Sequence, residues 1–160
     1  MSTTIAKQLK QKRPFASPEQ EALLGLRMAA ARLLVPWTQF LKNKADLTTS
    51  QYNILRILRG SRSTGLTCGE IGERTIAHDP DITRLVDRLD QRGLVKRTRS
   101  ETDRRVVDVN ITQKGLALLR ELDPHAERMP RALLGHVKPA RLRQLSRLLD
   151  EVLSGTATYP

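Results

Sequence analysis

The sequence predicts a mainly α-helical protein that carries one small β-hairpin. Apolar residues recur at helical spacing along most of the chain, and residues that favour helix ends separate these stretches. Two short β-prone runs, LVKRT and RVVDVNI, flank the polar segment RSETDR, as expected of a hairpin. Aromatic residues make up only 3% of the 160 residues, so the core is expected to consist of aliphatic side chains packed between helices.

The N-terminal region is expected to be a basic arm followed by a long helix. Residues 1–18 contain four basic residues and two prolines but little apolar periodicity, so they are predicted to form a flexible arm. Residues 19–44 repeat apolar side chains at helical spacing and predict one long helix, kinked at Pro36.

Two capping boxes locate the next two helices. Thr48 precedes Gln51 by three residues, and Thr67 precedes Glu70 by the same interval, each with apolar neighbours. The first box predicts a helix of about three turns from Thr49, ended by the loop residues of 60–65. The second predicts a short helix that ends near residue 75.

A fourth helix is predicted to begin at Asp79 and Pro80 and to end at Gly93. Its apolar stripe comprises Ile82, Leu85, Val86 and Leu89, and its polar face comprises Thr83, Arg84, Asp87, Arg88 and Gln91. The hairpin follows, and Thr112 is expected to cap the helix after it. Pro124 and Pro130 should bend or interrupt that helix, and a last helix follows Pro139.

The order of these elements is more informative than any one of them. A helix, a short helix, an amphipathic helix and a hairpin follow one another between Leu47 and Ile111. This order is typical of a helix-turn-helix extended by a β-hairpin wing. The predicted fold class is therefore mainly α, with a winged helix-turn-helix on a helical frame.

The charge of the chain favours a polyanionic partner. The formal net charge is +11, and residues 84–105 contain eight basic and four acidic residues. The alternative is that a basic surface merely keeps the protein soluble. The local enrichment favours nucleic acid.

The fourth helix meets the two requirements for entering a DNA major groove, because one face can pack on the protein while the other offers hydrogen-bonding groups. Asp81, Thr83 and Arg84 would face base edges, and Arg88 would reach a base or a phosphate. The alternative is that Arg84 and Arg88 pair with Asp81 and Asp87 or are simply solvated.

The hairpin is predicted to carry a basic tip. Arg99, Arg104 and Arg105 surround Asp103, so the carboxylate could fix one guanidinium while another enters the minor groove. An ordinary charged turn is the alternative interpretation.

Four segments together resemble the MarR (multiple-antibiotic-resistance regulator) family of bacterial transcriptional regulators. They are LTTSQYNIL, ITRLVDRLDQRGLVKR, the DRR of residues 103–105, and VNITQKG. The resemblance covers nearly the whole chain. It implies a homodimer in which helices from both chain ends intertwine, and a pseudo-palindromic operator in double-stranded DNA.

The resemblance also divides the chain and assigns roles. It implies a DNA-binding domain over 47–112 and a helical dimerisation region over 19–46 and 113–160. It assigns Arg104 to the minor groove and the segment from Pro80 to Arg84 to the major groove, with Thr67 capping its helix near a phosphate. Lys138 and Pro139 replace the usual serine-type cap of the last helix, which leaves the dimer geometry open.

Relatives of this kind often bind a small acidic or phenolic effector between the dimer frame and the winged module. Trp37, Phe40 and Tyr52 could line such a cavity. Large side chains at helical spacing are more often simple core, and that is the alternative.

Other classes of function find little support. Cys68 is the only cysteine, so a redox role lacks a resolving thiol, and a structural or incidental role is favoured. His78, His125 and His136 form no recognisable metal set, and the sequence indicates no cofactor. No nucleophile–base pair or phosphate-binding loop is evident, so an enzyme is not expected.

The sequence contains no apolar run of membrane-spanning length and no secretory signal, so a soluble cytoplasmic protein is expected, without a membrane partner. A winged-helix module for protein or RNA binding remains the alternative function, because such a fold does not dictate its partner.

Overall fold

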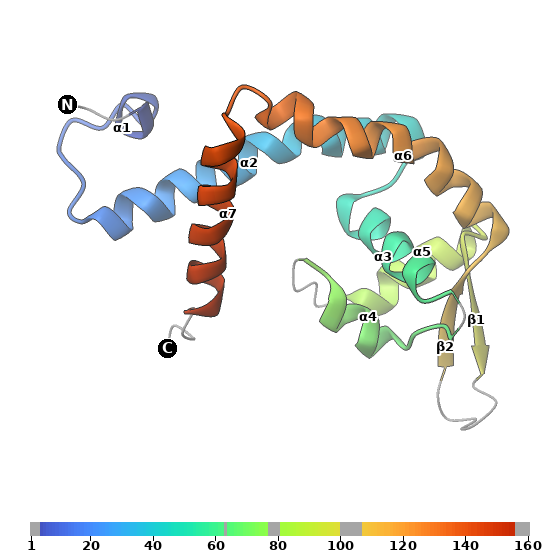
Figure 1. Ribbon diagram of the computed structural model, residues 1–160. Helices are drawn as coiled ribbons and strands as arrows, with labels where there is room; N and C mark the ends of the chain where they lie inside the picture. The colour runs from blue at the N-terminus through green and yellow to red at the C-terminus, as the bar shows by residue number, and fades with distance from the viewer. Residues whose placement is uncertain (1–3, 63, 77–80, 100–106, 156–160) are drawn as a thin grey trace. The chain divides into compact units, whose positions relative to one another are not determined.

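The computed structural model describes residues 4–62, 64–76, 81–99 and 107–155. The chain forms two compact units, Met1–Glu121 and Leu122–Pro160. Its elements are α1 (Thr4–Gln8), α2 (Pro18–Ala45), α3 (Thr49–Gly60), α4 (Cys68–Arg74), α5 (Ile82–Gln91), β1 (Val95–Arg99), β2 (Val107–Ile111), α6 (Gln113–Leu134) and α7 (Pro139–Ser154) (Figure 1). The predicted mainly α fold with one hairpin is confirmed.

The N-terminal segment contains a short helix that the sequence did not predict. Helix α1 lies in the segment expected to be an irregular arm. It contacts α2, where Ile5 packs over Gly25 and the Arg32 guanidinium donates to the Gln8 amide oxygen. A five-residue helix is too short to show a helical period in the sequence. So short a helix is stable only through tertiary contacts, here with α2.

Both predicted capping boxes are present. The Thr48 hydroxyl accepts a hydrogen bond from the Gln51 N–H at 3.1 Å, and the Gln51 side chain accepts one from the Thr48 N–H at 3.0 Å. Thr67 and Glu70 repeat the arrangement at 3.2 and 2.8 Å. The predicted starts of α3 and α4 are confirmed. They could be predicted from the sequence because such a cap involves only two residues that are three positions apart.

Helix α5 begins two residues later than predicted. Asp81 has a non-helical backbone (φ −124°, ψ 42°) and is the N-cap residue, so the first helical residue is Ile82. The Asp81 carboxylate pairs with the Arg84 guanidinium at 3.2 Å and makes no capping hydrogen bond. The prediction of a helix start at Asp79 and Pro80 is therefore wrong, and those two residues lie outside the described part of the chain.

The hairpin is tied to the loop before α4. Strands β1 and β2 pair antiparallel, with Val95 opposite Ile111 and Arg97 opposite Val109. Leu66 adds a bridge to the outer side of β2, because its N–H and C=O bond Val109 at 3.1 and 2.7 Å. No sequence pattern predicts this bridge, since a single residue has no period.

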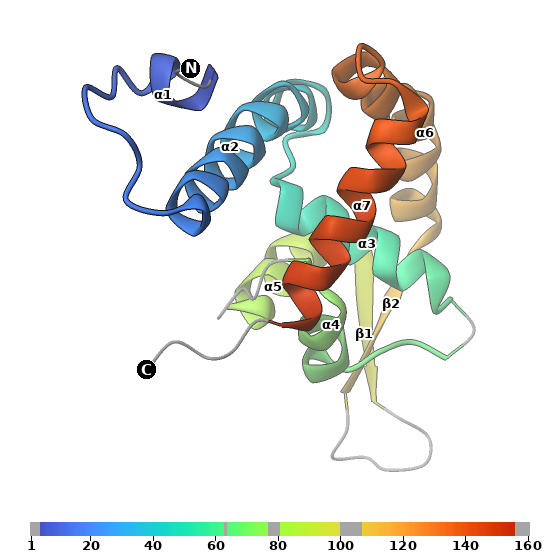
Figure 2. The same ribbon diagram turned by 60° about the vertical axis from the view of Figure 1, so that its left-hand side comes forward.

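The core lies between α3, α4, α5, the hairpin, the end of α2 and the start of α6 (Figure 2). Its most deeply buried side chains are Leu41, Leu47, Ile54, Leu55, Leu58, Ile71, Val86, Leu89, Leu94, Val95 and Leu119. Aliphatic side chains predominate, as the composition predicted.

Helix α6 is continuous through both of its prolines. Of the two predicted effects of Pro124 and Pro130, a bend or an interruption, the interruption does not occur. Both prolines are at least partly exposed, so backbone groups released there can be solvated, and the Arg128 guanidinium donates to the Pro124 carbonyl at 2.8 Å. Helix α7 begins at Pro139, as predicted. Within the described residues, no helix is both long and apolar enough to cross a membrane.

The first turn of α6 passes close to the start of the hairpin. The Thr112 hydroxyl accepts from the Gly115 N–H at 3.1 Å and donates to the Gly93 carbonyl at 2.7 Å. Gly115 is buried, and a Cβ atom there would collide with the carbonyl oxygen of Leu94. The close approach therefore requires glycine at this position.

We expect Gly115→Ala to destabilise the protein by about 1–3 kcal/mol, because backbone rather than a flexible side chain would have to move. Gly60→Ala is the matched control, since a Cβ atom there would meet nothing within 4 Å beyond its own helix and alanine favours a helix. The free energy of unfolding from urea titration measures both. Equal effects of the two substitutions would contradict the close approach.

Candidate nucleic-acid interface

Helix α5 separates its apolar and polar residues onto opposite faces. Ile82, Val86 and Leu89 are buried, and the helix packs against α3, α4 and β1. Thr83, Arg84 and Arg88 are exposed. The predicted contact residues of this helix, labelled α5 in Figures 1 and 2, therefore lie on its exposed side.

Arg84 is held by a weak local ion pair. Its guanidinium lies 3.2 Å from the Asp81 carboxylate, and the two side chains are 78% and 46% exposed. Pairing of Arg84 with Asp81 is the predicted alternative to a base contact, and this pair is present. Exposed pairs contribute little free energy, so Arg84 remains able to exchange Asp81 for another acceptor.

Asp87 pairs with a residue that the sequence analysis did not single out. Its carboxylate lies 2.6 Å from the Arg97 guanidinium, which comes from β1 and also donates to the Thr83 carbonyl at 3.3 Å. Arg97 thus fastens the first strand of the hairpin to α5 and neutralises an acidic group beside the exposed face. Strand alternation was the available signal, because Arg97 shares a face with the buried Val95.

Thr67 is engaged in its helix cap. Its hydroxyl accepts from the Glu70 N–H at 3.2 Å and donates to the Glu70 carboxylate at 2.9 Å. Hydrogen bonds from the Thr67 backbone N–H and hydroxyl lower the pKa of Glu70 below its usual value. A carboxylate therefore occupies the start of α4, where a phosphate contact was expected.

The described part of the wing adds one predicted residue to this surface. Arg99 is the last residue of β1 and is exposed. The predictions for Pro80, Asp103, Arg104 and Arg105 fall on residues outside the described part of the chain.

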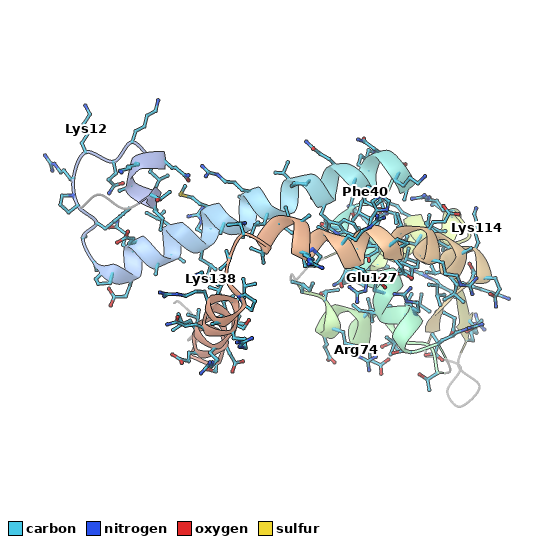
Figure 3. All side chains as sticks on the ribbon, turned by 45° about the horizontal axis from the view of Figure 1, so that its top comes forward. Lys12, Phe40, Arg74, Lys114, Glu127 and Lys138 are labelled. Carbon is cyan, nitrogen blue, oxygen red and sulfur yellow. The ribbon has the colours of Figure 1, made fainter. Side chains whose placement is uncertain are left out.

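The three aromatic residues proposed for an effector cavity pack on one another. Trp37 and Phe40 of α2 stack with ring centroids 5.4 Å apart, and Tyr52 of α3 meets Trp37 edge-on at 5.0 Å. Trp37 and Tyr52 are buried, whereas Phe40, which is labelled in Figure 3, is half-buried. The cluster joins α2 to α3 and serves at least as core, in line with the alternative interpretation.

Residues 4–62, 64–76, 81–99 and 107–155 contain no group of three or more His, Cys, Asp or Glu side chains that could hold a metal ion. His78 lies outside these ranges. Cys68 is the half-buried first residue of α4.

The arrangement of α4, α5 and the antiparallel hairpin defines the chain as a winged helix-turn-helix protein. The sequence profile of the MarR family matches residues 45–106. The organic hydroperoxide resistance transcriptional regulator of Bacillus subtilis is 32% identical over 136 residues, which are 84% of this chain and 88% of that regulator. The chain belongs to the MarR family of transcriptional regulators.

Solved structures agree with this assignment. The chain is similar to a MarR transcription factor from Planctomyces limnophilus, with 39% identity, a TM-score of 0.64, and coverage of 86% of this chain and 98% of the other. It is also similar to Bordetella bronchiseptica BpsR, whose DNA binding is described as regulated by 6-hydroxynicotinic acid. That similarity has 27% identity, a TM-score of 0.68, and coverage of 79% and 94%. Because these relatives are regulators, the prediction that the protein is not an enzyme is confirmed.

The contact between Arg97 and Asp87 predicts a measurable coupling. We expect the free energies of unfolding of Asp87→Asn, Arg97→Gln and the double variant to be non-additive by about 0.5–1 kcal/mol, because each single substitution removes the same half-buried pair. Urea unfolding of the four proteins measures the coupling. Strict additivity would show that the pair does not fasten the hairpin to α5.

Proposed function

We propose that the protein binds double-stranded DNA sequence-specifically as a transcriptional regulator. The observation that carries the proposal is the accessible face of α5, where Thr83, Arg84 and Arg88 lie opposite a buried apolar stripe. An α-helix with such a face can enter the major groove, where an arginine can bind guanine with two hydrogen bonds. Because the target is DNA, the proposal places the protein in the cytoplasm of a bacterial cell.

The wing extends the proposed interface. Arg99 is exposed at the end of β1, and the resemblance assigns minor-groove insertion to Arg104. Arg105, which the sequence places beside Arg104, is proposed as a further DNA contact of the wing. Pairing of Arg97 with Asp87 supports the same surface, because an uncompensated carboxylate beside it would repel phosphates. Pro80 and Asp81 would lie at the groove, and Thr67 would keep its role as the cap of α4 near a phosphate.

A homodimer is proposed as the binding species. Large apolar side chains remain exposed on α2 and on α7, and they are Leu23, Leu26, Leu34, Val35, Leu145, Leu148, Val152 and Leu153. Helix α7 has no buried residue. Rows of exposed apolar side chains on helices mark contact surfaces, so residues 19–46 and 113–160 are proposed to hold two copies together while 47–112 binds DNA.

We further propose that a small aromatic or acidic compound releases the protein from DNA. BpsR, to which this chain is similar, is described as regulated by 6-hydroxynicotinic acid. The half-buried Phe40 at the edge of the Trp37 and Tyr52 cluster offers an aromatic surface between α2 and α3. Release requires that the compound bind the free conformation more tightly than the DNA-bound one.

Selection of bound sequences from random duplex DNA tests the proposed function. We expect an enriched palindrome with half-sites about one helical turn apart, because two α5 helices of a dimer would enter successive major grooves. A salt titration of the winning duplex measures the phosphate contribution. Steeply salt-dependent binding without enrichment would indicate a non-specific nucleic-acid binder, and no binding to duplex DNA would favour an RNA or protein partner.

Two substitutions separate the roles of helix and wing. We expect Arg84→Ala to lose about 1–3 kcal/mol of discrimination at one base position, because it removes a base contact. Arg104→Ala should instead weaken binding to all duplexes. Affinities for the selected duplex and its single-base variants measure both effects, and unchanged affinity in both variants would refute the groove assignments.

A further inference from the structure

Helix α5 ends in a motif that fixes the direction of the chain. Arg92 is the C-cap residue, and Gly93 has the left-handed φ of 66°. The Leu94 N–H donates to the Leu89 carbonyl at 3.0 Å, and the Gly93 N–H donates to the Asp90 carbonyl at 2.7 Å, which together form a Schellman motif. The backbone from which the Arg92 side chain departs is therefore held in place.

The Arg92 side chain reaches the end of α2. Its guanidinium donates to the Ala45 carbonyl at 2.7 Å and to the Asp46 carbonyl at 2.8 Å. Asp46 is the C-cap residue of α2, with a left-handed φ of 47°. Carbonyls at a helix C-terminus have no partner within the helix and carry the negative end of its dipole, so a cation with two donors suits this position.

A third contact adds the start of α6. The Lys114 ammonium donates to the Arg92 carbonyl at 2.8 Å, and Lys114 lies in the first turn of α6 (Figure 3). One residue thus joins three segments that are far apart in the sequence, namely the ends of α2 and α5 and the beginning of α6. All of these groups lie within the first compact unit.

We infer that Arg92 is a positioning residue, which sets the orientation of α5 relative to α2 and thereby controls sequence-specific recognition without contacting a base. The inference rests on the proposed DNA-binding function. Arg92 lies at one end of α5, whereas Thr83 and Arg84 lie at the other. A ten-residue helix is about 15 Å long, so a tilt of about 10° around Arg92 would move the far end by roughly 2–3 Å.

A displacement of that size is enough to break a base contact, because hydrogen bonds weaken beyond a donor–acceptor distance of about 3.2 Å. Non-specific phosphate contacts tolerate such movement better, since they depend on charge more than on direction. The structure also gives a route for control, because α2 carries Trp37 and Phe40. Movement of its C-terminal end would reach α5 through the two hydrogen bonds of Arg92.

The test compares the affinity of the full-length protein for its selected duplex with its affinity for a scrambled duplex at the same salt concentration. We expect Arg92→Gln to lower the ratio of the two affinities about tenfold, which corresponds to the discrimination supplied by one good base contact. Arg120→Gln is the control, because it removes the same charge from an exposed position on α6. The control should leave the ratio unchanged, and both variants should bind the scrambled duplex equally.

Arg92→Lys provides a second measurement if the glutamine variant fails to fold. Lysine keeps the charge but is a single point donor, so it cannot satisfy both carbonyls in the geometry of a guanidinium. We expect an intermediate ratio with unchanged salt dependence. A purely stabilising role would lower the melting temperature and leave the ratio of the folded protein at the wild-type value, which would overturn the inference.

The two proposals fail in different ways. If the wild-type protein prefers no duplex over another, sequence-specific recognition is absent, and the proposed function fails together with the positioning role. If the wild-type protein selects a duplex and Arg92→Gln retains the full preference, only the inference about Arg92 fails.

Discussion

Burial of Ile82, Val86 and Leu89 determines which side of α5 is available to a partner. These side chains recur at the helical period and pack against α3, α4 and β1. Rotation of the helix about its axis would expose them and bury Thr83, Arg84 or Arg88 instead. Burying a charged group without a partner costs several kcal/mol, so the same apolar contacts that form the core also hold the polar face outward.

Two arginines fix the orientation of α5 more specifically than its apolar contacts do. Apolar packing has little directional preference, whereas a guanidinium offers several donors in a fixed plane. Arg97 joins the hairpin to α5 through Asp87, and Arg92 joins the end of α5 to the last carbonyls of α2. The helix is therefore held by groups that connect it to two other segments.

The helices outside this core expose more of their large apolar side chains than the helices within it. The N-terminal part of α2 and the whole of α7 leave large apolar side chains exposed, whereas α3, α4 and α5 bury theirs within the chain. A helix whose apolar stripe is exposed gains little from tertiary packing, which supplies most helical stability in proteins. Under the proposed dimer, a second copy would cover these exposed side chains, so the stability of the two helices would depend on association.

Features that depend on residues close together in the chain could be predicted from the sequence alone. The capping boxes at Thr48 and Thr67, the end of α5 at Gly93 and the two strands of the hairpin were all predicted, because each depends on a local hydrogen bond or period. The start of α5 was misplaced, because Asp79 and Pro80 match a helix start in sequence whereas the backbone at Asp81 is not helical.

Contacts between distant segments follow only from the way the chain packs in three dimensions. The bridge from Leu66 to Val109, the pair of Asp87 with Arg97 and the bonds from Arg92 to Ala45 and Asp46 join groups that are far apart in the sequence. Any exposed arginine can pair with many acceptors, and a local pattern does not distinguish among them. The packing of α2, α5 and the hairpin makes that choice, because it brings particular acceptors within hydrogen-bonding distance of each guanidinium.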